Sequence, residues 1–115
     1  MSINHYKKSD RYSVAVTHGN TIYLTGQTSR KETIKEQTAE VLEKIEAILA
    51  DNKSDKDHML SVTIYLKNMD DFDAMNEVYD AWVSKNTPPT RACVEAKMAR
   101  DCLLVEMKVI AAVIE

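Results

Sequence analysis

The chain has 115 residues, of which 44% are hydrophobic and 29% are charged, and its formal net charge is -3. This length predicts a single domain over residues 1–115 with one hydrophobic core. The mild acidity argues against a nucleic-acid partner, because phosphate binding requires a basic surface. No apolar run is long enough to span a bilayer, and the N-terminal MSINHYKKSDRY lacks the apolar segment of a secretory signal, so we expect neither a membrane partner nor secretion. Cys93 and Cys102 form no CxxC pair, which favours a reduced, cytoplasmic setting.

Two short strands are predicted near the N-terminus. Residues 12–17 (YSVAVT) and 21–25 (TIYLT) have the β-branched and aromatic composition that is typical of strands. His18-Gly19-Asn20 between them favours a turn, so the two strands are predicted to form a hairpin, and Gly26 ends the second strand.

An amphipathic helix is predicted next. Thr33 and Glu36 have the spacing of a capping box, in which each residue satisfies a free backbone amide of the other. Apolar residues then recur at helical spacing, and the pattern ends near Asn52. The stripe consists of Ile34, Val41, Leu42, Ile45, Ile48 and Leu49.

A third strand and a second helix follow. Residues 60–67 alternate between apolar and polar side chains, which predicts a strand with one apolar face. Asp70 or Asp71 is predicted to cap the second helix. Its expected buried stripe is Phe72, Met75, Val78, Tyr79, Trp82 and Val83.

Two further strands, over residues 90–98 and 103–113, complete the predicted order β-β-α-β-α-β-β. This order predicts an α+β fold with a single sheet and both helices on one face. The second face of that sheet is predicted to carry Thr63, Tyr65, Arg91, Cys93, Glu95, Leu104, Glu106 and Ile110. A face of such mixed composition usually meets another subunit, so we expect a closed oligomer with ligand sites between its subunits.

Arg91 is the principal candidate for function. It follows two prolines in the segment TPPTRACVE, and its permanent charge requires an anionic partner. If the last two strands pair as a hairpin, Arg91 and Cys93 lie on the same face as Glu106. Either Arg91 and Glu106 form a structural ion pair at a subunit interface, or Arg91 grips a substrate carboxylate while Glu106 orients or deprotonates water. The residues alone leave both alternatives open.

Other catalytic chemistry has little support in the sequence. The three histidines, His5, His18 and His58, have no metal-ligand spacing, and two glycines cannot form a phosphate-binding loop. No histidine is placed to act as a base for Cys93, and buried cysteines are usually inert. We therefore expect no metal site.

Several segments resemble the Rid family, the reactive intermediate deaminases that are also called the YjgF/YER057c/UK114 family. The segment Pro89-Thr90-Arg91-Ala92-Cys93-Val94-Glu95, followed by Leu104-Val105-Glu106-Met107, is similar to the family signature. The stretches YSVAV at residues 12–16 and GNTIYLTGQ at residues 19–27 also resemble family motifs. The resemblance extends in order over almost the whole chain.

The resemblance implies a chorismate-mutase-like fold and a homotrimer, in which three sheets form a central barrel and three clefts lie between subunits. It implies hydrolysis of 2-imino acids, and of 2-enamino tautomers such as 2-aminoacrylate, to 2-oxo acids and ammonia without a cofactor. Arg91 would then hold the substrate carboxylate and Glu106 would position the attacking water.

The resemblance also implies roles for residues around these two. Backbone groups near Cys93 and Gly26 would help to hold the substrate, Tyr12 would close the cleft, and Thr25 would keep the hydroxyl of a frequent family serine. The loop of residues 28–35 is shorter than in typical members, which changes a wall of the cleft. The alternative function is a non-catalytic trimer that binds a small carboxylate metabolite, or a protein, through the same cleft.

Overall fold

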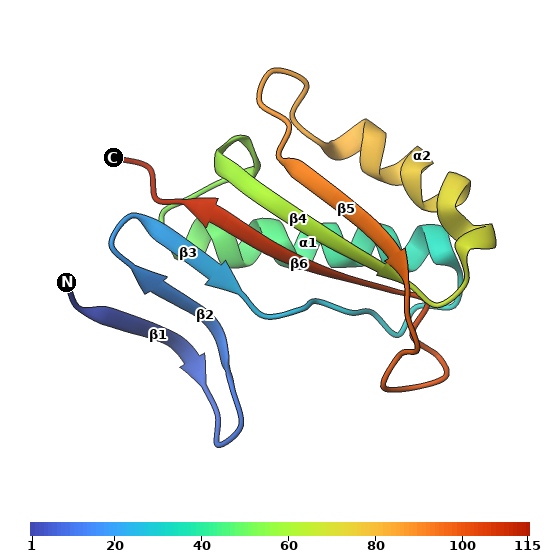
Figure 1. Ribbon diagram of the computed structural model, residues 1–115, viewed down its shortest axis with the longest axis horizontal. Helices are drawn as coiled ribbons and strands as arrows, with labels where there is room; N and C mark the ends of the chain where they lie inside the picture. Colours follow the sequence, from blue (N-terminus) through green and yellow to red (C-terminus); the bar gives the residue numbers. More distant parts are fainter.

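A computed structural model describes all 115 residues as a six-stranded sheet with two helices on one face (Figure 1). The strands lie side by side in the order β1-β2-β3-β6-β4-β5. Their bounds are β1 Ile3–Lys8, β2 Ser13–His18, β3 Thr21–Leu24, β4 Met59–Leu66, β5 Thr90–Glu95 and β6 Val105–Ala112. The helices are α1, Ile34–Asp51, and α2, Phe72–Trp82. The predicted α+β fold with a single sheet is confirmed, with one strand more than predicted.

The additional strand is β1, at the N-terminus. It pairs antiparallel with β2, with Ile3 opposite His18 and Lys8 opposite Ser13. Only Tyr6 is partly buried, because β1 is an outer strand with little packed against it. A segment of this kind shows no alternation of apolar residues, so the sequence pattern did not reveal it.

The predicted hairpin of β2 and β3 is confirmed. His18 lies opposite Thr21, and Gly19 in the turn has a φ of 63°, which glycine adopts without steric cost. After β3 the chain continues beside β6, where Gln27 and Met107 form an isolated antiparallel bridge. This bridge positions the segment around Gly26 next to the start of β6.

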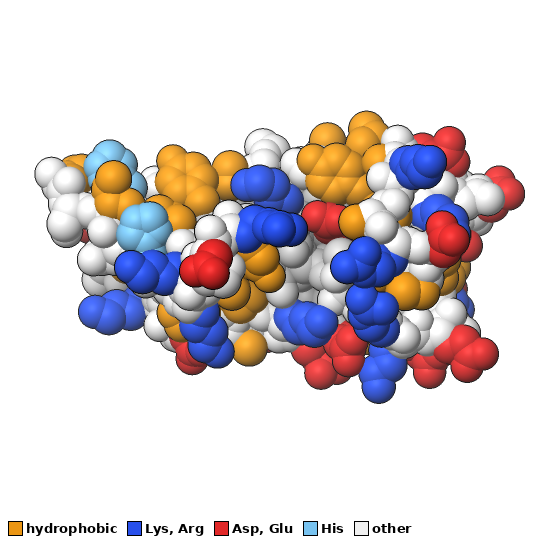
Figure 2. All heavy atoms as spheres, turned by 90° about the horizontal axis from the view of Figure 1, so that it is seen from below, with side chains coloured by type: hydrophobic (Ala, Val, Ile, Leu, Met, Phe, Trp, Pro, Cys, Tyr) orange, Lys and Arg blue, Asp and Glu red, His pale blue; other side chains and the backbone are white.

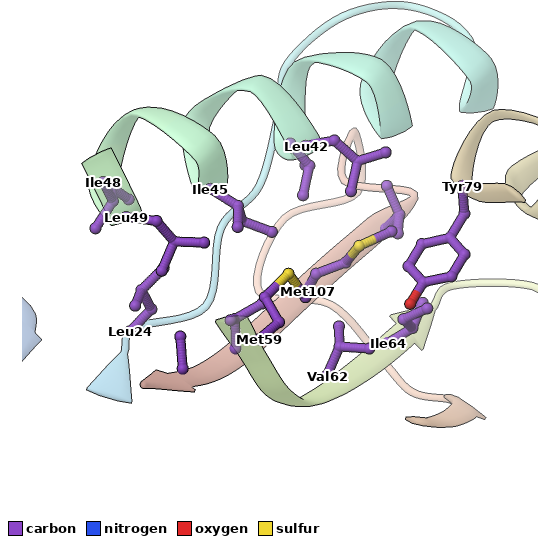
Figure 3. Packing of buried hydrophobic residues seen from close by; sticks show 14 of the residues in the cluster. Leu24, Leu42, Ile45, Ile48, Leu49, Met59, Val62, Ile64, Tyr79 and Met107 are labelled. Atoms are coloured by element: carbon purple, nitrogen blue, oxygen red, sulfur yellow. The ribbon is translucent and has the colours of Figure 1, made fainter. Parts of the chain in front are cut away.

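Helix α1 begins at the predicted capping box. The Glu36 amide donates to the Thr33 hydroxyl at 3.1 Å, and the Thr33 amide donates to Glu36 Oε1 at 3.2 Å. Figure 3 shows the apolar stripe of α1 directed toward the sheet, where residues of three strands meet it: Leu42, Ile45, Ile48 and Leu49 on the helix, and Leu24, Met59 and Met107 on the strands.

Helix α2 begins differently from the prediction. Asp71 stands at the N-cap position, but its side chain makes no capping hydrogen bond. The Asn68 side chain instead accepts from the Asp70 amide at 2.8 Å and starts a short 3-10 turn, η2 (Met69–Asp71), which leads into α2. The predicted stripe of α2 faces the core, with Met75 and Tyr79 buried and the other four residues partly buried.

The last two strands do not pair as a hairpin, so the condition for placing Arg91 beside Glu106 is not met. Strand β6 lies between β3 and β4 and is antiparallel to both, whereas β5 pairs only with β4, in parallel, at the edge of the sheet. A parallel neighbour requires a crossover connection, and α2 provides it. The loop of residues 96–104 then carries the chain past β4 to β6, so β5 and β6 never pair.

The hydrophobic core lies between the helices and one face of the sheet. It is a cluster of 18 buried residues, to which β6 contributes every second side chain: Val105, Met107, Val109 and Ala111. Full burial of a large aliphatic side chain contributes about 1.5–3 kcal/mol, so this layer supplies most of the stabilisation. Neither α1 nor α2 has the length and apolar character that a membrane crossing requires.

The opposite face of the sheet carries no helix, and we call it the open face. Its central residues are Tyr23, Thr63, Tyr65, Glu106, Lys108 and Ile110. The predicted positions of Thr63, Tyr65, Glu106 and Ile110 on this face are confirmed, because each alternates with a buried neighbour.

Candidate functional site

The side chains of Arg91, Cys93 and Glu95 do not lie on the open face, so this prediction is wrong. In the parallel register of β4 and β5 these three residues lie beside Val62, Ile64 and Leu66, which are all buried under the helices. Neighbours in register share a face of the sheet. The side chains of the three β5 residues therefore point toward α2, whereas Glu106 points to the opposite side.

The guanidinium of Arg91 lies against two aromatic rings of α2. Its central carbon is 4.9 Å from the centroid of the Tyr79 ring and 5.8 Å from that of Phe72. Contacts of this kind contribute about 0.5–1 kcal/mol at exposed sites and restrict the orientation of the guanidinium. Three ion pairs form in the structure and none includes Arg91, so Arg91 and Glu106 form no ion pair within one chain.

Tyr79 provides the platform in its neutral form. Burial raises the pKa of its phenol above the usual value, and the positive charge of Arg91 opposes this only in part. The phenol therefore keeps its proton at neutral pH. Arg91 thus lies on a neutral ring and retains its positive charge for an anion from outside the chain.

Cys93 is a partly buried thiol that packs against the core. Burial raises the pKa of the Cys93 thiol, and the charge of Arg91 counteracts this only in part. A thiol with a raised pKa is a poor nucleophile at neutral pH, because the thiolate is the reactive form. The side chain of Cys93 is therefore a packing group, and a contact between its backbone and a ligand stays a prediction.

The backbone of β5 offers hydrogen-bonding groups at the edge of the sheet. The amide of Ala96 donates to the Leu66 carbonyl at 2.9 Å, so every second residue before it also bonds to β4. The alternate residues, which include Arg91 and Cys93, direct their amides and carbonyls away from β4. An unpaired edge of this kind presents donors and acceptors to whatever lies beside it.

Asn76 is a further candidate that the sequence analysis missed. It lies on α2 at the spacing that places it between Phe72 and Tyr79 on one helical face. Its Oδ1 atom is buried without a hydrogen-bond partner. Buried polar atoms are nearly always paired, so an unpaired acceptor beside the Arg91 platform is notable. A polar residue within the apolar stripe of α2 was the available signal.

Glu106 and Gly26 form the second part of the predicted site, on the open face. A Cβ atom on Gly26 would lie 2.0 Å from Glu106 Oε2, so the carboxylate occupies the space that only glycine leaves free. The bridge beside them is short: the Gln27 amide donates to the Met107 carbonyl at 2.9 Å. Gly26 and Glu106 line a cleft of about 350 Å³ together with Tyr65 and Lys108.

Gln37 joins two loops that lie far apart in the sequence. Its Nε2 donates to the carbonyls of Lys31 at 2.9 Å and Cys102 at 2.8 Å, and its Oε1 accepts from the Leu104 amide at 2.9 Å. The residue is fully buried on α1. The loop before α1 and the loop before β6 are thereby joined to one side chain, which the sequence analysis did not single out.

The remaining predicted residues lie apart from Arg91 within one chain. Thr25 precedes Gly26, and its amide donates to the Val14 carbonyl at 2.9 Å. Tyr12 is 56% exposed beside the turn between β1 and β2, and these strands lie at the opposite end of the sheet from β5. One chain therefore brings together Arg91 with Cys93, and Thr25 and Gly26 with Glu106, but not these groups with each other. No cluster of His, Cys, Asp or Glu residues is arranged to hold a metal ion.

The fold and these residue groups define a small α+β protein with polar groups on both faces of one sheet. The family model described as Endoribonuclease L-PSP matches residues 2–113. The chain belongs to this family, which includes the YjgF and RutC proteins. This confirms the family to which the sequence motifs pointed.

Individual relatives cover almost the whole chain. The RutC family protein YoaB of Escherichia coli K12 is 39% identical over 114 residues, which is 98% of this chain and 100% of the relative. A crystal structure of a YjgF-family protein from Neisseria meningitidis has a TM-score of 0.98 and 44% identity, and the match covers 100% of this chain and 98% of that one. A Rid-family protein of unknown function from Yersinia pestis, YyfA, has a TM-score of 0.86 and 28% identity, with 92% and 90% coverage.

Proposed function

We propose that this protein hydrolyses reactive 2-imino acids, and 2-enamino tautomers such as 2-aminoacrylate, to 2-oxo acids and ammonia. The observation that carries the proposal is the guanidinium of Arg91, which is held against two aromatic rings and has no acidic partner in its own chain. Membership of a family with a Rid protein among its solved structures adds support.

Arg91 binds the substrate carboxylate in this scheme. A guanidinium presents parallel N–H donors that match the two oxygens of a carboxylate, and charged hydrogen bonds of this kind are stronger than neutral ones. The ring of Tyr79 limits the orientations of the fork before the substrate arrives. The outward amide of Cys93 is available for a further polar contact with the substrate.

The complete site requires two copies of the chain, because Arg91 and Glu106 point to opposite faces of one sheet. We propose a homotrimer in which Arg91 of one subunit faces Glu106 and Gly26 of the next, with Tyr12 closing the cleft. The open face supports an assembly, since Tyr23 and Val94 on it are 43% and 47% exposed in the single chain. Light scattering at micromolar concentration should give the mass of a trimer, and the mass of a monomer would contradict the proposal.

Glu106 activates water in the cleft. Its carboxylate accepts a proton from water while the water oxygen adds to C2 of the C=N bond, which gives a carbinolamine. Glu106 passes this proton to the nitrogen, then removes the proton of the C2 hydroxyl and transfers it to the nitrogen as the C–N bond breaks. Ammonia leaves, and the hydroxyl oxygen becomes the carbonyl oxygen. The products are the 2-oxo acid and ammonia, and no redox partner is required. The contact with Gly26 fixes where the carboxylate stands.

The alternative is a trimer that binds small carboxylates, or a protein, without catalysis. The two functions are separated by adding the purified protein to freshly generated 2-aminoacrylate and following pyruvate and ammonia. We expect release well above the spontaneous rate, and no acceleration by Arg91→Ala under the same conditions. Wild-type protein that binds pyruvate but leaves the rate at the spontaneous value would support the non-catalytic alternative.

A further inference from the structure

Two lysines beside Glu106 have no partner in the structure. Lys97, which follows the end of β5, and Lys108, on the open face two residues beyond Glu106, line the same cleft as the glutamate. Neither forms an ion pair, and neither ammonium group donates a hydrogen bond, whereas the ammonium groups of several other lysines are paired. Both lysines therefore keep their charge available in the cleft.

A second cleft continues this cationic surface. It measures about 390 Å³ and shares residues 96–98 with the first, and Lys67 and Arg100 add to its lining. Together the two clefts present four cationic and three acidic side chains, in a chain whose net charge is -3. The acid Glu95 is already engaged, since its Oε1 accepts from the Met69 amide at 3.0 Å. Figure 2 looks onto this end of the molecule and shows Lys and Arg side chains spread across it.

The surplus of positive charge exceeds what a simple imino acid requires. Under the proposed function, Arg91 holds the carboxylate next to the reacting carbon and Glu106 works on water. Lys97 and Lys108 then remain without an ion-pair partner, and a carboxylate on the substrate side chain would provide one. A cleft of about 350 Å³ has room for a chain of four or five carbons.

We propose that the preferred substrates are 2-imino dicarboxylates, the imines of acidic amino acids, with Lys97 and Lys108 binding the side-chain carboxylate. This inference rests on the proposed function and specifies its substrate class.

The test compares two imines that differ in the second carboxylate. 2-Iminosuccinate is generated from L-aspartate, and 2-iminobutanoate from L-2-aminobutanoate, by flavin oxidases with catalase present, and the 2-oxo acid products are followed by coupled dehydrogenases. For the wild type we expect kcat/KM to be about tenfold higher for 2-iminosuccinate. The preference should shrink as salt is raised, because salt screens partly exposed charges.

Substitution of Lys97 and Lys108 tests whether these two lysines cause the preference for 2-iminosuccinate. Lys108→Met and Lys97→Met should each lower the ratio of the two kcat/KM values about three- to fivefold, and Lys108→Glu should reverse the preference. Lys85→Met is the matched control, since Lys85 is an exposed lysine before β5, at the other end of that strand from Lys97. The ratio of the two kcat/KM values in this variant should equal that of the wild type. Circular dichroism and light scattering establish that each variant is folded and assembled. Competitive inhibition by succinate should weaken in the lysine variants, while inhibition by butyrate should not.

The outcomes distinguish this inference from the proposed function. Turnover of 2-iminobutanoate with no preference for 2-iminosuccinate would overturn the substrate assignment and leave the deaminase intact. A preference that persists in both lysine variants would also overturn it. Turnover of neither imine would overturn the proposed function and the inference together.

Discussion

Arg91 and Glu106 stand on opposite faces of the same sheet, and their surroundings differ in kind. Arg91 belongs to the outer strand β5 and is positioned by contact with the rings of Tyr79 and Phe72 on α2. Glu106 belongs to β6, inside the sheet, and is positioned by backbone contact with Gly26 on the open face. The region around β5 presents the Arg91 guanidinium at the edge of the sheet, whereas the region around β6 holds the Glu106 carboxylate against Gly26.

This difference shows how two groups of opposite charge avoid neutralising each other in one chain. If β5 and β6 had paired, Arg91 and Glu106 would have been close enough to form an ion pair, and neither would have been free for a substrate. The crossover through α2 instead separates them, and an assembly of copies can bring them together with space between. The variants below test each region, in order of decreasing expected effect.

Arg91→Ala should have the largest effect. Loss of a charged, bidentate contact costs on the order of 2–5 kcal/mol in a desolvated site, which is about 30-fold to several thousand-fold in kcat/KM. Arg91→Lys should recover little of it, because an ammonium lacks the planar fork. Steady-state kinetics with 2-aminoacrylate measures the loss. The trimer mass and melting temperature should stay close to those of the wild type, whereas loss of both would show that Arg91 is a structural ion-pair partner between subunits.

Glu106→Gln should lower kcat by about 100-fold or more while binding of a carboxylate inhibitor changes little. A carboxylate accepts the proton of water and an amide does not, and general acid–base catalysis typically contributes at least this much. Single-turnover kinetics and inhibitor titration separate the two quantities. A rise in KM alone, with kcat preserved, would restrict Glu106 to binding.

Gly26→Ala should lower activity by about tenfold to 100-fold with little loss of stability. The new methyl group would collide with the Glu106 carboxylate, whose flexible end must then move by an ångström or more. Displacements of that size commonly cost such factors. Thermal melts should change little because Gly26 has no positive φ to be strained. Activity equal to that of the wild type would mean that the position of Glu106 is unimportant.

Cys93→Ser should have the smallest effect, a loss of less than about threefold. Burial keeps the thiol protonated, and the outward amide that is available to a substrate is retained in serine. The kcat/KM of the variant is the measurement, with its trimer mass as a control. Complete inactivation of a trimeric Cys93→Ser protein would instead indicate covalent catalysis.

The open face and the core were largely predictable from the sequence because buried apolar residues recur at every second position along most of β4 and β6. Such alternation assigns each side chain to a face once the apolar set is buried. The segment TRACVE of β5 has no such pattern, since it is an outer strand with mostly exposed residues. Its face depends on the register with β4, which the parallel crossover sets and local sequence does not.

The candidate site was predictable only residue by residue. The motifs indicated Arg91 and Glu106, but the contact between Gly26 and Glu106 joins segments far apart in the chain and leaves no local signal. The three bonds of Gln37 to two loops are equally invisible in the sequence, because they depend on how β6 is inserted beside β3. The family resemblance indicated Arg91 and Glu106, whereas the structure was needed to show that they lie on opposite faces of the sheet.

The most direct test of a site shared between subunits is complementation by mixed trimers. Arg91→Ala and Glu106→Gln chains, each inactive alone, are coexpressed with different affinity tags, and trimers carrying both tags are purified and assayed. A cleft formed between neighbours is intact when one subunit supplies Arg91 and the next supplies Glu106. Every trimer that carries both tags then has one intact cleft of three, so the purified mixed trimers should show about one third of wild-type activity. Activity no higher than that of the separate variants would contradict the shared site.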